Sequence, residues 1–472
     1  MPPKRISNAL CEKGRQTMRD QTTSIGRREF LERSAAAAAA VQIAQPSKAN
    51  SAAETVVLAQ IGCGGRGSMV CSAIAKLPNV QVAYVCDPED GRAAALQASL
   101  EKDTGHKPKA VREMRRVLDD KAVDGVIIST PEQWHGLASI WACQAGKDVY
   151  VEKNCSLGIW ESRKMIEAAR RYKRIVQVGT QNRSAPYNMS ARSYLSSGKL
   201  GKVQLVKVFN LQGGAKWTPK QDSATPAGLD WDLWLGPAQA RPYNAGCHRS
   251  WGDYRDYCGG TLSGDGSHQL DLARMVMGDP GHPKSVNYMG GRFLYDDGWT
   301  WPDTYEIAYE YPGFVMTMEN GNFTPYMDKI AWDIRESLTE YPFWPQCATR
   351  IEIYGTEGIM YLGRHGGGWQ VFGKAKTQSH AAPLVAQDNG VFPDRDHQTN
   401  FLDCIRTRKT PTADIEVAHP SACLVHFANV AHFTGKRHLE FDSSTETFTN
   451  DATANHFLKP HYRKGYTVPD KP

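Results

Sequence analysis

Beyond its first 53 residues, the sequence contains no apolar run long enough to cross a membrane and no internal repeat or low-complexity tract. It also lacks an excess of basic charge. Nine Lys and Arg against four Asp and Glu lie in those first 53 residues, so only about +1 of the formal charge of +6 belongs to the rest. We therefore expect a soluble protein with no stable membrane insertion and no nucleic-acid partner.

The first 53 residues predict an export leader outside the fold. Arg27 to Leu31, with the letters RREFL, precede a stretch of small and apolar residues from Ser34 to Ala44 that is too short for a permanent membrane helix. This pattern is typical of a twin-arginine signal and predicts a periplasmic bacterial protein. Ser51 to Ala53 offer small residues for cleavage but no strict Ala-x-Ala, so the cleavage site is not defined.

The eleven cysteines do not predict a disulfide framework. Their number is odd and one lies in the leader, while Cys63, Cys71, Cys86 and Cys143 fall in segments with turn, helix or buried-strand patterns. Twin-arginine export carries proteins that have folded in the reducing cytoplasm. We expect most of these thiols to be free and structural.

A glycine-rich turn, Gly62-Cys63-Gly64-Gly65-Arg66-Gly67, directly follows the apolar run from Val56 to Ile61. Such a turn lets the backbone approach a pyrophosphate, and the helix that begins near Ser68 offers the anion its free N–H groups. The next strand, Val80 to Cys86, ends in Asp87, 20 residues beyond Gly67, where a carboxylate accepts the ribose hydroxyls of NAD. The alternative, a glycine turn in an unrelated α/β domain, is disfavoured by this spacing.

Two kinds of periodicity divide the rest of the chain. Strands and helices alternate over residues 54–181, which predicts an α/β domain with a doubly wound parallel sheet. Residues 182–442 predict an α+β domain with a mainly antiparallel sheet, including a hairpin from Arg350 to Leu362. Residues 1–53 form the leader and linker, and 443–472 a tail. Residues 213–241 and 363–392, rich in Gly, Pro and Trp, are predicted to be loops over a cleft.

Several motifs together resemble the Gfo/Idh/MocA family, named after glucose-fructose oxidoreductase, inositol dehydrogenase and MocA. They are the glycine turn, Thr130-Pro131 with Trp134 and His135, Glu152-Lys153-Asn154, and Gly259 to Leu262 leading to His268 and Asp271. Residues 178–183 and 229–237 resemble its exported branch in sugar-degrading bacteria. The resemblance implies a Rossmann domain that binds NAD or NADP, an open-faced sheet that walls a sugar site, and a homo-oligomer.

The same resemblance, with the strand and turn context, assigns the cofactor-binding residues. They are Gly62, Cys63, Gly64, Gly65, Arg66, Gly67, Asp87, Thr130, Pro131, Trp134, His135, Glu152, Lys153 and Gln181. NAD is expected rather than NADP, because Asp87 would repel a 2′-phosphate and no Arg immediately follows it. His135 fits two roles, since it could line the nicotinamide pocket or hydrogen-bond the turn.

Oxidation of a secondary alcohol needs a base for the hydroxyl proton and a donor that holds the developing carbonyl oxygen. His268 suits the first role and Lys153 the second; the alternatives are a core or capping histidine and a lysine paired with a neighbouring carboxylate. Asp271 is expected to orient His268 or cap the following helix. Asp265 is the fourth candidate catalytic residue.

Two departures from the family pattern affect this assignment. Asn154 stands where the family's Glu-Lys-Pro motif has proline, so a cis peptide there is costly and the local turn is expected to differ. The family places an aspartate four residues before the histidine, whereas Gly264 occupies that position and Asp265 lies three before His268. The acid role of Asp265 is therefore open.

Three functions compete. The first is an NAD-dependent oxidoreductase acting on a secondary hydroxyl of a sugar, glycoside or cyclitol, with a tightly held cofactor because a periplasm contains little free nicotinamide nucleotide. The second is a redox-neutral NAD-dependent glycosidase or lyase, which the retained Lys153 disfavours. The third is a non-catalytic nucleotide-binding protein, which the intact motifs disfavour. No metal site is expected, since His419 and His426 on one helix would lie roughly 10 Å apart.

Overall fold

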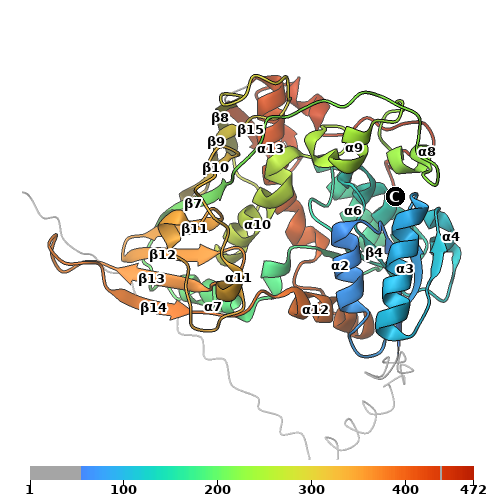
Figure 1. Ribbon diagram of the computed structural model, residues 1–472. Coiled ribbons are helices and arrows are strands. Elements are labelled where there is room, and N and C mark those ends of the chain that lie inside the picture. The colour runs from blue at the N-terminus through green and yellow to red at the C-terminus, as the bar shows by residue number, and fades with distance from the viewer. Residues whose placement is uncertain (1–54, 436–437) are drawn as a thin grey trace, which may run out of the picture. The chain divides into compact units, whose positions relative to one another are not determined.

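The computed structural model describes residues 55–435 and 438–472, which belong to one compact unit (Figure 1). The predicted leader and its cleavage site lie outside the described residues. None of the described helices is both long enough and apolar enough to span a membrane. The ten described cysteines are buried and form no disulfide, which confirms the prediction of free structural thiols.

The first sheet is parallel throughout and has the strand order β3-β2-β1-β4-β5-β6. Its strands are β1 (Val56–Ile61), β2 (Val80–Cys86), β3 (Lys109–Val111), β4 (Gly125–Ile128), β5 (Asp148–Val151) and β6 (Val176–Val178). The helices between them are α2 (Gly65–Ile74), α3 (Asp90–Thr104), α4 (Met114–Asp119), α5 (His135–Gln144) and α6 (Ile159–Arg171). The strand order reverses direction at β1, and ligands bind such sheets in the crevice at this point.

The second sheet is larger, with the order β14-β13-β12-β11-β7-β10-β9-β8-β15-β16. Its strands are β7 (Val203–Leu211), β8 (Ser285–Gly291), β9 (Thr304–Tyr311), β10 (Phe314–Gly321), β11 (Arg350–Gly355), β12 (Gly358–Gly363), β13 (Trp369–Gly373), β14 (Leu384–Asp388), β15 (His438–Asp442) and β16 (Thr447–Phe448). The predicted hairpin is confirmed as β11 and β12. The other pairings are antiparallel except β7 with β10, which is parallel.

One sequence prediction about this sheet is wrong. Residues 363–392 do not form a loop throughout, because β13 and β14 pair within that stretch. Gly366, Gly367 and Gly368, all with positive φ, make the turn between β12 and β13. A turn rich in glycine between short strands resembles an irregular loop in sequence, since the pairing partners are not visible locally.

Helices cover one face of the second sheet. They are α7 (Pro186–Ser196), α10 (Ser267–Val276) and α13 (Ile415–Thr434), of which α10 and α13 lie between that sheet and the first one in Figure 1. Alternate residues of β9 are buried on that side, such as Ile307 and Tyr309, while Glu306 and Glu310 are exposed on the other. The sheet is therefore open-faced, as predicted.

The remaining helices are short or return to the first domain. The short ones are Glu132–Trp134, Gln181–Ser184, α8 (Trp231–Leu235), α9 (Ala245–Arg249), Trp251–Asp253, Leu262–Gly266, α11 (Trp332–Arg335), Trp344–Gln346 and Ala454–Phe457. Helix α12 (Asp394–Thr407) packs Phe401 and Ile405 against Leu58 and Ile127 of the first sheet. Because parallel strands are buried on both faces, this late helix completes a core that sequence order alone would assign to residues 54–181.

Candidate active site

The glycine-rich turn joins β1 to α2 and leaves open space beside its backbone. Gly62 has a φ of +88°, and a Cβ there would lie 2.7 Å from the Ser129 carbonyl carbon. A Cβ on Gly67 would lie 2.0 Å from the Gly62 oxygen, whereas one on Gly65 would meet no heavy atom within 4 Å. Helix α2 has no side-chain cap at Gly64, so its first N–H groups remain available to an anion.

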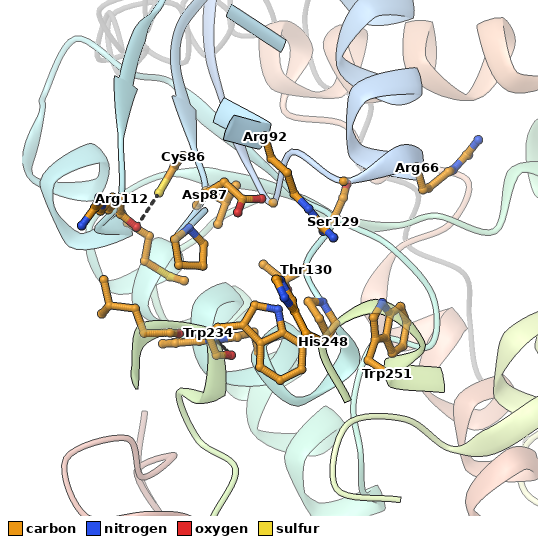
Figure 2. Close-up of a pocket in the computed structure, with 18 of the residues that line it drawn as sticks. Arg66, Cys86, Asp87, Arg92, Arg112, Ser129, Thr130, Trp234, His248 and Trp251 are labelled. Atoms are coloured by element: carbon orange, nitrogen blue, oxygen red, sulfur yellow. Dashed lines mark hydrogen bonds between the residues drawn. The ribbon is translucent and has the colours of Figure 1, made fainter. Parts of the chain in front are cut away.

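A cavity opens at this turn (Figure 2). Its wall includes Asp87 and four residues of the turn, Gly62, Gly64, Gly65 and Arg66. The Asp87 carboxylate is buried and accepts hydrogen bonds from the backbone N–H of Cys63 at 2.7 Å and of Glu89 at 2.9 Å. Burial raises its pKa above the usual range for aspartate. Asp87 thus lies where the sequence predicted a ribose-binding carboxylate, and it also fixes the glycine turn.

Two hydroxyl groups in the cavity wall fit a nucleotide. Ser129 and Thr130, at the end of β4, line the cavity, and both of their buried hydroxyl oxygens lack a hydrogen-bond partner within the described chain. Buried hydroxyls are normally paired. With the open backbone at Gly65 and the uncapped start of α2, these donors match the sugar and phosphate groups of a dinucleotide.

Sequence analysis missed three arginines in the same wall, Arg92, Arg112 and Arg249. Figure 2 shows Arg92 between Asp87 and Ser129. Its side chain comes from α3, five residues after Asp87, and forms an ion pair with Glu89 at 2.7 Å. The prediction of NAD from the sequence considers only an arginine that directly follows Asp87. Arg92 lies farther along the chain, and the first turn of α3 places its side chain at the cavity. Both charge signs therefore lie near the expected ribose site.

A segment of the second domain closes over the cavity, and we call residues 228–258 the strap. Leu233, Trp234, His248, Arg249 and Trp251 of the strap line the cavity. Its fit against the first domain is close: the Trp134 indole N–H contacts the carbonyls of Leu233 and Trp234 at 3.1 and 3.2 Å. Trp231 and Trp234 stack with ring centroids 4.6 Å apart in a small core of their own.

The strap is also fastened by polar contacts at the loop after Asp87. The Asp90 N–H donates to the Gly228 carbonyl, and the Asp230 N–H to the Pro88 carbonyl, both at 2.9 Å. Arg249 donates to both carboxylate oxygens of Glu89, at 2.7 and 3.0 Å. The predicted loop over a cleft is confirmed for this part of residues 213–241, which the short helix α8 interrupts.

Lys153 follows β5 directly, and the peptide bond between Lys153 and Asn154 is cis. The Lys153 ammonium donates a hydrogen bond to the Gly264 carbonyl in the helical turn Leu262–Gly266. This contact joins the end of the first sheet to the start of α10. The lysine is only partly buried, so its ammonium is accessible to a small ligand.

His268 lies in the first turn of α10 and is buried. Its Nδ1 atom has no hydrogen-bond partner within residues 55–435 and 438–472. Burial, and then the positive charges of Arg364 and Lys153, hold the pKa of this imidazole well below its usual range. The lowered pKa favours the neutral form of His268, which has one nitrogen without a partner in that part of the chain. The sequence instead predicts a base with a pKa near neutrality.

The structure argues against an acid role for Asp265. Its carboxylate forms ion pairs with Lys329 at 2.6 Å and with Arg364 at 3.3 Å, and accepts from Gln212 at 3.2 Å. Burial alone would raise its pKa, but the charges of Arg364, His365 and Lys329 hold it well below the usual range. These charges favour the ionised form of Asp265, which does not suit the role of a proton donor.

Asp271 has a different role from either one predicted. Its buried carboxylate accepts hydrogen bonds from Arg183 at 2.8 and 2.9 Å and from Ser421 at 2.7 Å. The residue before α10 is Gly266, so Asp271 does not cap this helix. It instead ties α10 to α13 and to the helical turn Gln181–Ser184.

Two other predicted cofactor residues act through neighbours. Glu152 holds Arg66 in an ion pair at 2.9 Å, and the Tyr150 hydroxyl contacts Glu152 at 3.4 Å. Gln181 donates to that Tyr150 hydroxyl at 3.2 Å. These residues position Arg66 at the cavity.

Of the two roles predicted for His135, lining the nicotinamide pocket and hydrogen-bonding the turn, the structure shows the second. Its ring nitrogens contact the backbone carbonyls of Asn154 at 2.6 Å and Thr130 at 2.8 Å, so it bridges the turn after β4 to the turn after β5. Pro131 and Trp134, from the same motif, line the cavity.

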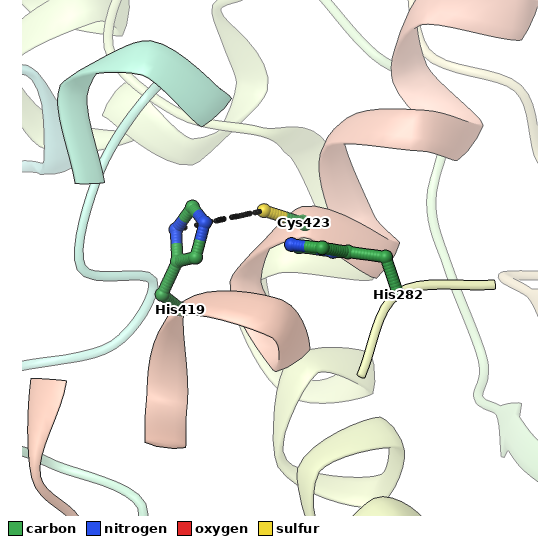
Figure 3. A group of neighbouring side chains, drawn as sticks. All are labelled: His282, His419 and Cys423. Carbon is green, nitrogen blue, oxygen red and sulfur yellow. Dashed lines mark hydrogen bonds between the residues drawn. The ribbon is translucent and has the colours of Figure 1, made fainter. Parts of the chain in front are cut away.

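A group of possible metal ligands lies away from this site. His282, His419 and Cys423 offer atoms within 4.8 Å of one another (Figure 3). Both histidines already contact Glu446 through Nε2, at 2.7 Å for His419 and 3.3 Å for His282. Burial holds the pKa of the Cys423 thiol well above its usual range. His419 and Cys423 lie on α13, while His282 lies before β8, and the hydrogen bonds to Glu446 join these segments in a network.

Comparison with known proteins places the chain in a family. Residues 56–180 match the oxidoreductase family with an NAD-binding Rossmann fold, and residues 192–322 and 366–468 match its C-terminal α/β domain. The chain therefore belongs to the Gfo/Idh/MocA oxidoreductase family. This confirms the resemblance inferred from the motifs, and with it the predicted fold.

Individual relatives are more distant. A scyllo-inositol 2-dehydrogenase (NAD(+)) of Bacillus subtilis is 25% identical over 358 residues, which is 72% of this chain and 82% of that protein. A glycosyl hydrolase family 109 protein of Stenotrophomonas maltophilia is 36% identical over 132 residues, 27% of this chain and 29% of that protein. The structure of an aldose-aldose oxidoreductase from Caulobacter crescentus superposes with a TM-score of 0.59 at 17% identity, covering 82% of this chain and 100% of that one.

Proposed function

We propose that this oxidoreductase uses NAD to oxidise a secondary hydroxyl of a sugar, glycoside or cyclitol, and that it holds the nucleotide tightly. The observation that carries the proposal is that His268, whose Nδ1 has no hydrogen-bond partner within the described chain, lies in the electrostatic field of the Lys153 ammonium and of Arg66, which lines the dinucleotide cavity. The inositol dehydrogenase relative supports the substrate class.

The chain's own residues supply the acid–base part of the reaction. When bound, the nicotinamide accepts the hydride that leaves the hydroxyl-bearing carbon. The Lys153 ammonium donates a hydrogen bond to the substrate oxygen and stabilises the negative charge that develops there. His268, neutral in the free protein with its pKa held low, accepts a hydrogen bond from the hydroxyl at a ring nitrogen and takes the proton when substrate binding raises that pKa. Asp265 stays ionised throughout and contributes charge rather than a proton.

The choice of NAD rests on Asp87. A 2′-phosphate would meet this buried carboxylate at the end of β2, with the acidic Glu89 two residues on. Arg92 is already paired with Glu89, which reduces its capacity to bind a second anion. We therefore propose a preference for NAD. Tighter binding of NADP would show that Arg92 influences the choice of cofactor more than Asp87 does.

Tight retention rests on the strap and on the leader. The strap lies against the first domain through the Trp134 and Glu89 contacts and walls one side of the cavity. We propose that residues 1–53 direct twin-arginine export of the folded, nucleotide-loaded protein to the bacterial periplasm, where little free cofactor is available. We also propose that the exposed face of the second sheet joins copies of this chain in a homo-oligomer.

A redox-neutral glycosidase is the second candidate, because the glycosyl hydrolase family 109 relative matches 132 residues of the chain. One experiment separates the two. The purified protein is freed of unbound nucleotide, bound nucleotide is identified by mass spectrometry, and sugars, cyclitols and aryl glycosides are added without oxygen. A dehydrogenase accumulates the absorbance of reduced nicotinamide with a sugar or cyclitol. Release of the aryl group without net reduction would instead establish the glycosidase and reject our first proposal.

A further inference from the structure

Cationic side chains outnumber carboxylates beside His268. Lys329 and Arg364, from the second domain, converge on the Asp265 carboxylate at 2.6 and 3.3 Å. Lys153 approaches the adjacent residue, Gly264, from the first domain. Because Gly264 and Asp265 are adjacent in the chain, these contacts bring the three cations to the same turn before α10.

Nearby carboxylates balance only part of the positive charge of Lys153, Lys329 and Arg364. The nearby Arg66 has two acidic partners of its own, Glu152 at 2.9 Å and Asp394 at 3.3 Å. Lys153, by contrast, has a neutral carbonyl as its hydrogen-bond acceptor. Lys329 and Arg364 share the single charge of Asp265. Within the described residues, Asp265 is the only carboxylate that forms an ion pair with these three cations, while Glu152 acts on Lys153 and Asp394 on Arg364 through space, so the excess of positive charge is partial. The cationic form of bound oxidised nicotinamide would add to this excess.

Arg364 carries the strongest indication of a missing partner. Its side chain is 11% exposed, and its Nε atom has no hydrogen bond within the described chain, because the 3.3 Å contact with Asp265 lacks hydrogen-bond geometry. A buried guanidinium without full pairing is costly. The fork of an arginine side chain matches the two oxygens of a carboxylate or a phosphate.

We propose that the substrate is an acidic sugar, one that carries a carboxylate or a phosphate monoester, and that Arg364 and Lys329 bind its anionic group while Lys153 holds the hydroxyl to be oxidised. This inference rests on the proposed function and names the substrate class of the same site. A neutral sugar would leave the excess charge uncompensated.

The same arrangement links binding to proton transfer. The positive charge of Arg364 is one of the factors that hold the pKa of His268 low. An anion bound to Arg364 cancels part of that field, so His268 becomes a stronger base when the acidic substrate is present. Lys153 and Arg66 also face His268, and their charges remain.

The test compares matched sugars on the nucleotide-loaded protein. Glucose, galactose and mannose are each compared with the corresponding uronate and 6-phosphate, and kcat and KM are measured from nicotinamide reduction at low and high salt. We expect kcat/KM to be at least about 10-fold higher for one acidic sugar than for its neutral counterpart, and this ratio to fall at high salt. The uronate and phosphate arms distinguish the two anions. Equal or better oxidation of the neutral sugars would overturn the inference.

Three variants locate the effect. Arg364→Gln and Lys329→Gln should each raise KM for the acidic sugar by about 10-fold or more, since hydrogen bonds to charged groups contribute about 1.5–3 kcal/mol. Lys374→Gln is the matched control, because Lys374 is exposed and pairs with Glu357 away from the site. An unchanged acid preference in Arg364→Gln and Lys329→Gln would also overturn the inference.

Calorimetry separates this inference from the proposed function. If no sugar of either kind reduces the nicotinamide, the proposed oxidation fails, and binding alone then decides the anion site. Titration of the same uronates and phosphates into the loaded protein should release heat that Arg364→Gln abolishes. Absence of such binding in the unmodified protein would reject the anion site as well.

Discussion

Nucleotide retention should depend on the ion pair between Arg249 and Glu89, which joins the strap to the loop after Asp87. The two terminal nitrogens of the Arg249 guanidinium donate to Glu89, at 2.7 and 3.0 Å. The Arg249 side chain is 51% exposed and that of Glu89 20% exposed, so solvent screens the pair. We assign the pair about 1 kcal/mol rather than the larger value of a buried one. If strap opening limits release, Arg249→Met should accelerate nucleotide loss about 5-fold, since 1.4 kcal/mol is a factor of ten.

The measurement follows bound nucleotide per chain in samples that are gel-filtered at increasing times after dilution. Arg249 also lines the cavity, so a second variant separates a latch from a direct contact. Glu89→Gln leaves Arg249 in place, breaks the charge pair from the other side, and should accelerate release by a similar factor. It also frees Arg92 from Glu89, so Arg92→Gln is measured beside it to separate that effect. Arg241→Met is the control within the strap, because Arg241 pairs with Asp222, which lies just before the strap and not in the first domain.

Two outcomes would refute this reasoning. Equal release from the unmodified protein and from Arg249→Met would show that the pair does not restrain the strap. Fast release from Arg249→Met but not from Glu89→Gln would show that Arg249 acts by touching the nucleotide. High salt should bring the unmodified protein toward the variants, because screening weakens an exposed pair.

Three further predictions concern the chemistry, the cofactor and acid stability. Lys153→Ala should lower kcat by about 10² to 10⁴ while the protein keeps its nucleotide. Asp265→Asn should lower kcat less, because Asp265 transfers no proton. Steady-state kinetics test both variants, and the bound nucleotide is measured on the same samples. Asp87→Ser should lose the preference for NAD over NADP, and equal affinity of the unmodified protein for the two, by fluorescence titration, would contradict it. Burial lowers the pKa of His397 to about 4 and of His426 to about 3, below an unfolded value near 6.5, so stability present above pH 6.5 is lost as the pH falls. Each of these two histidines should lower the free energy of unfolding by about 2 kcal/mol at pH 5 relative to pH 7, as measured by urea unfolding. The His397→Gln variant should show a smaller dependence of this free energy on pH.

The sequence by itself determined the parts of this protein that depend on neighbouring residues. Gly62 and Gly67 are required by local backbone geometry, and the apolar runs that flank them define the first strands of the parallel sheet. Asp87 and Lys153 could be found for the same reason, because each follows directly after a strand of the parallel sheet, and the ends of such strands meet at one edge.

Only the tertiary structure decided the contacts between distant segments. The sequence named Asp265 as a candidate catalytic residue and left its acid role open. Lys329 and Arg364 reach it from segments whose pattern carries no sign of the encounter. Asp271 finds Arg183 in the same way. These pairings arise from packing the second sheet and its helices against the first domain, and side-chain charge in one segment contains no information about which distant segment will face it.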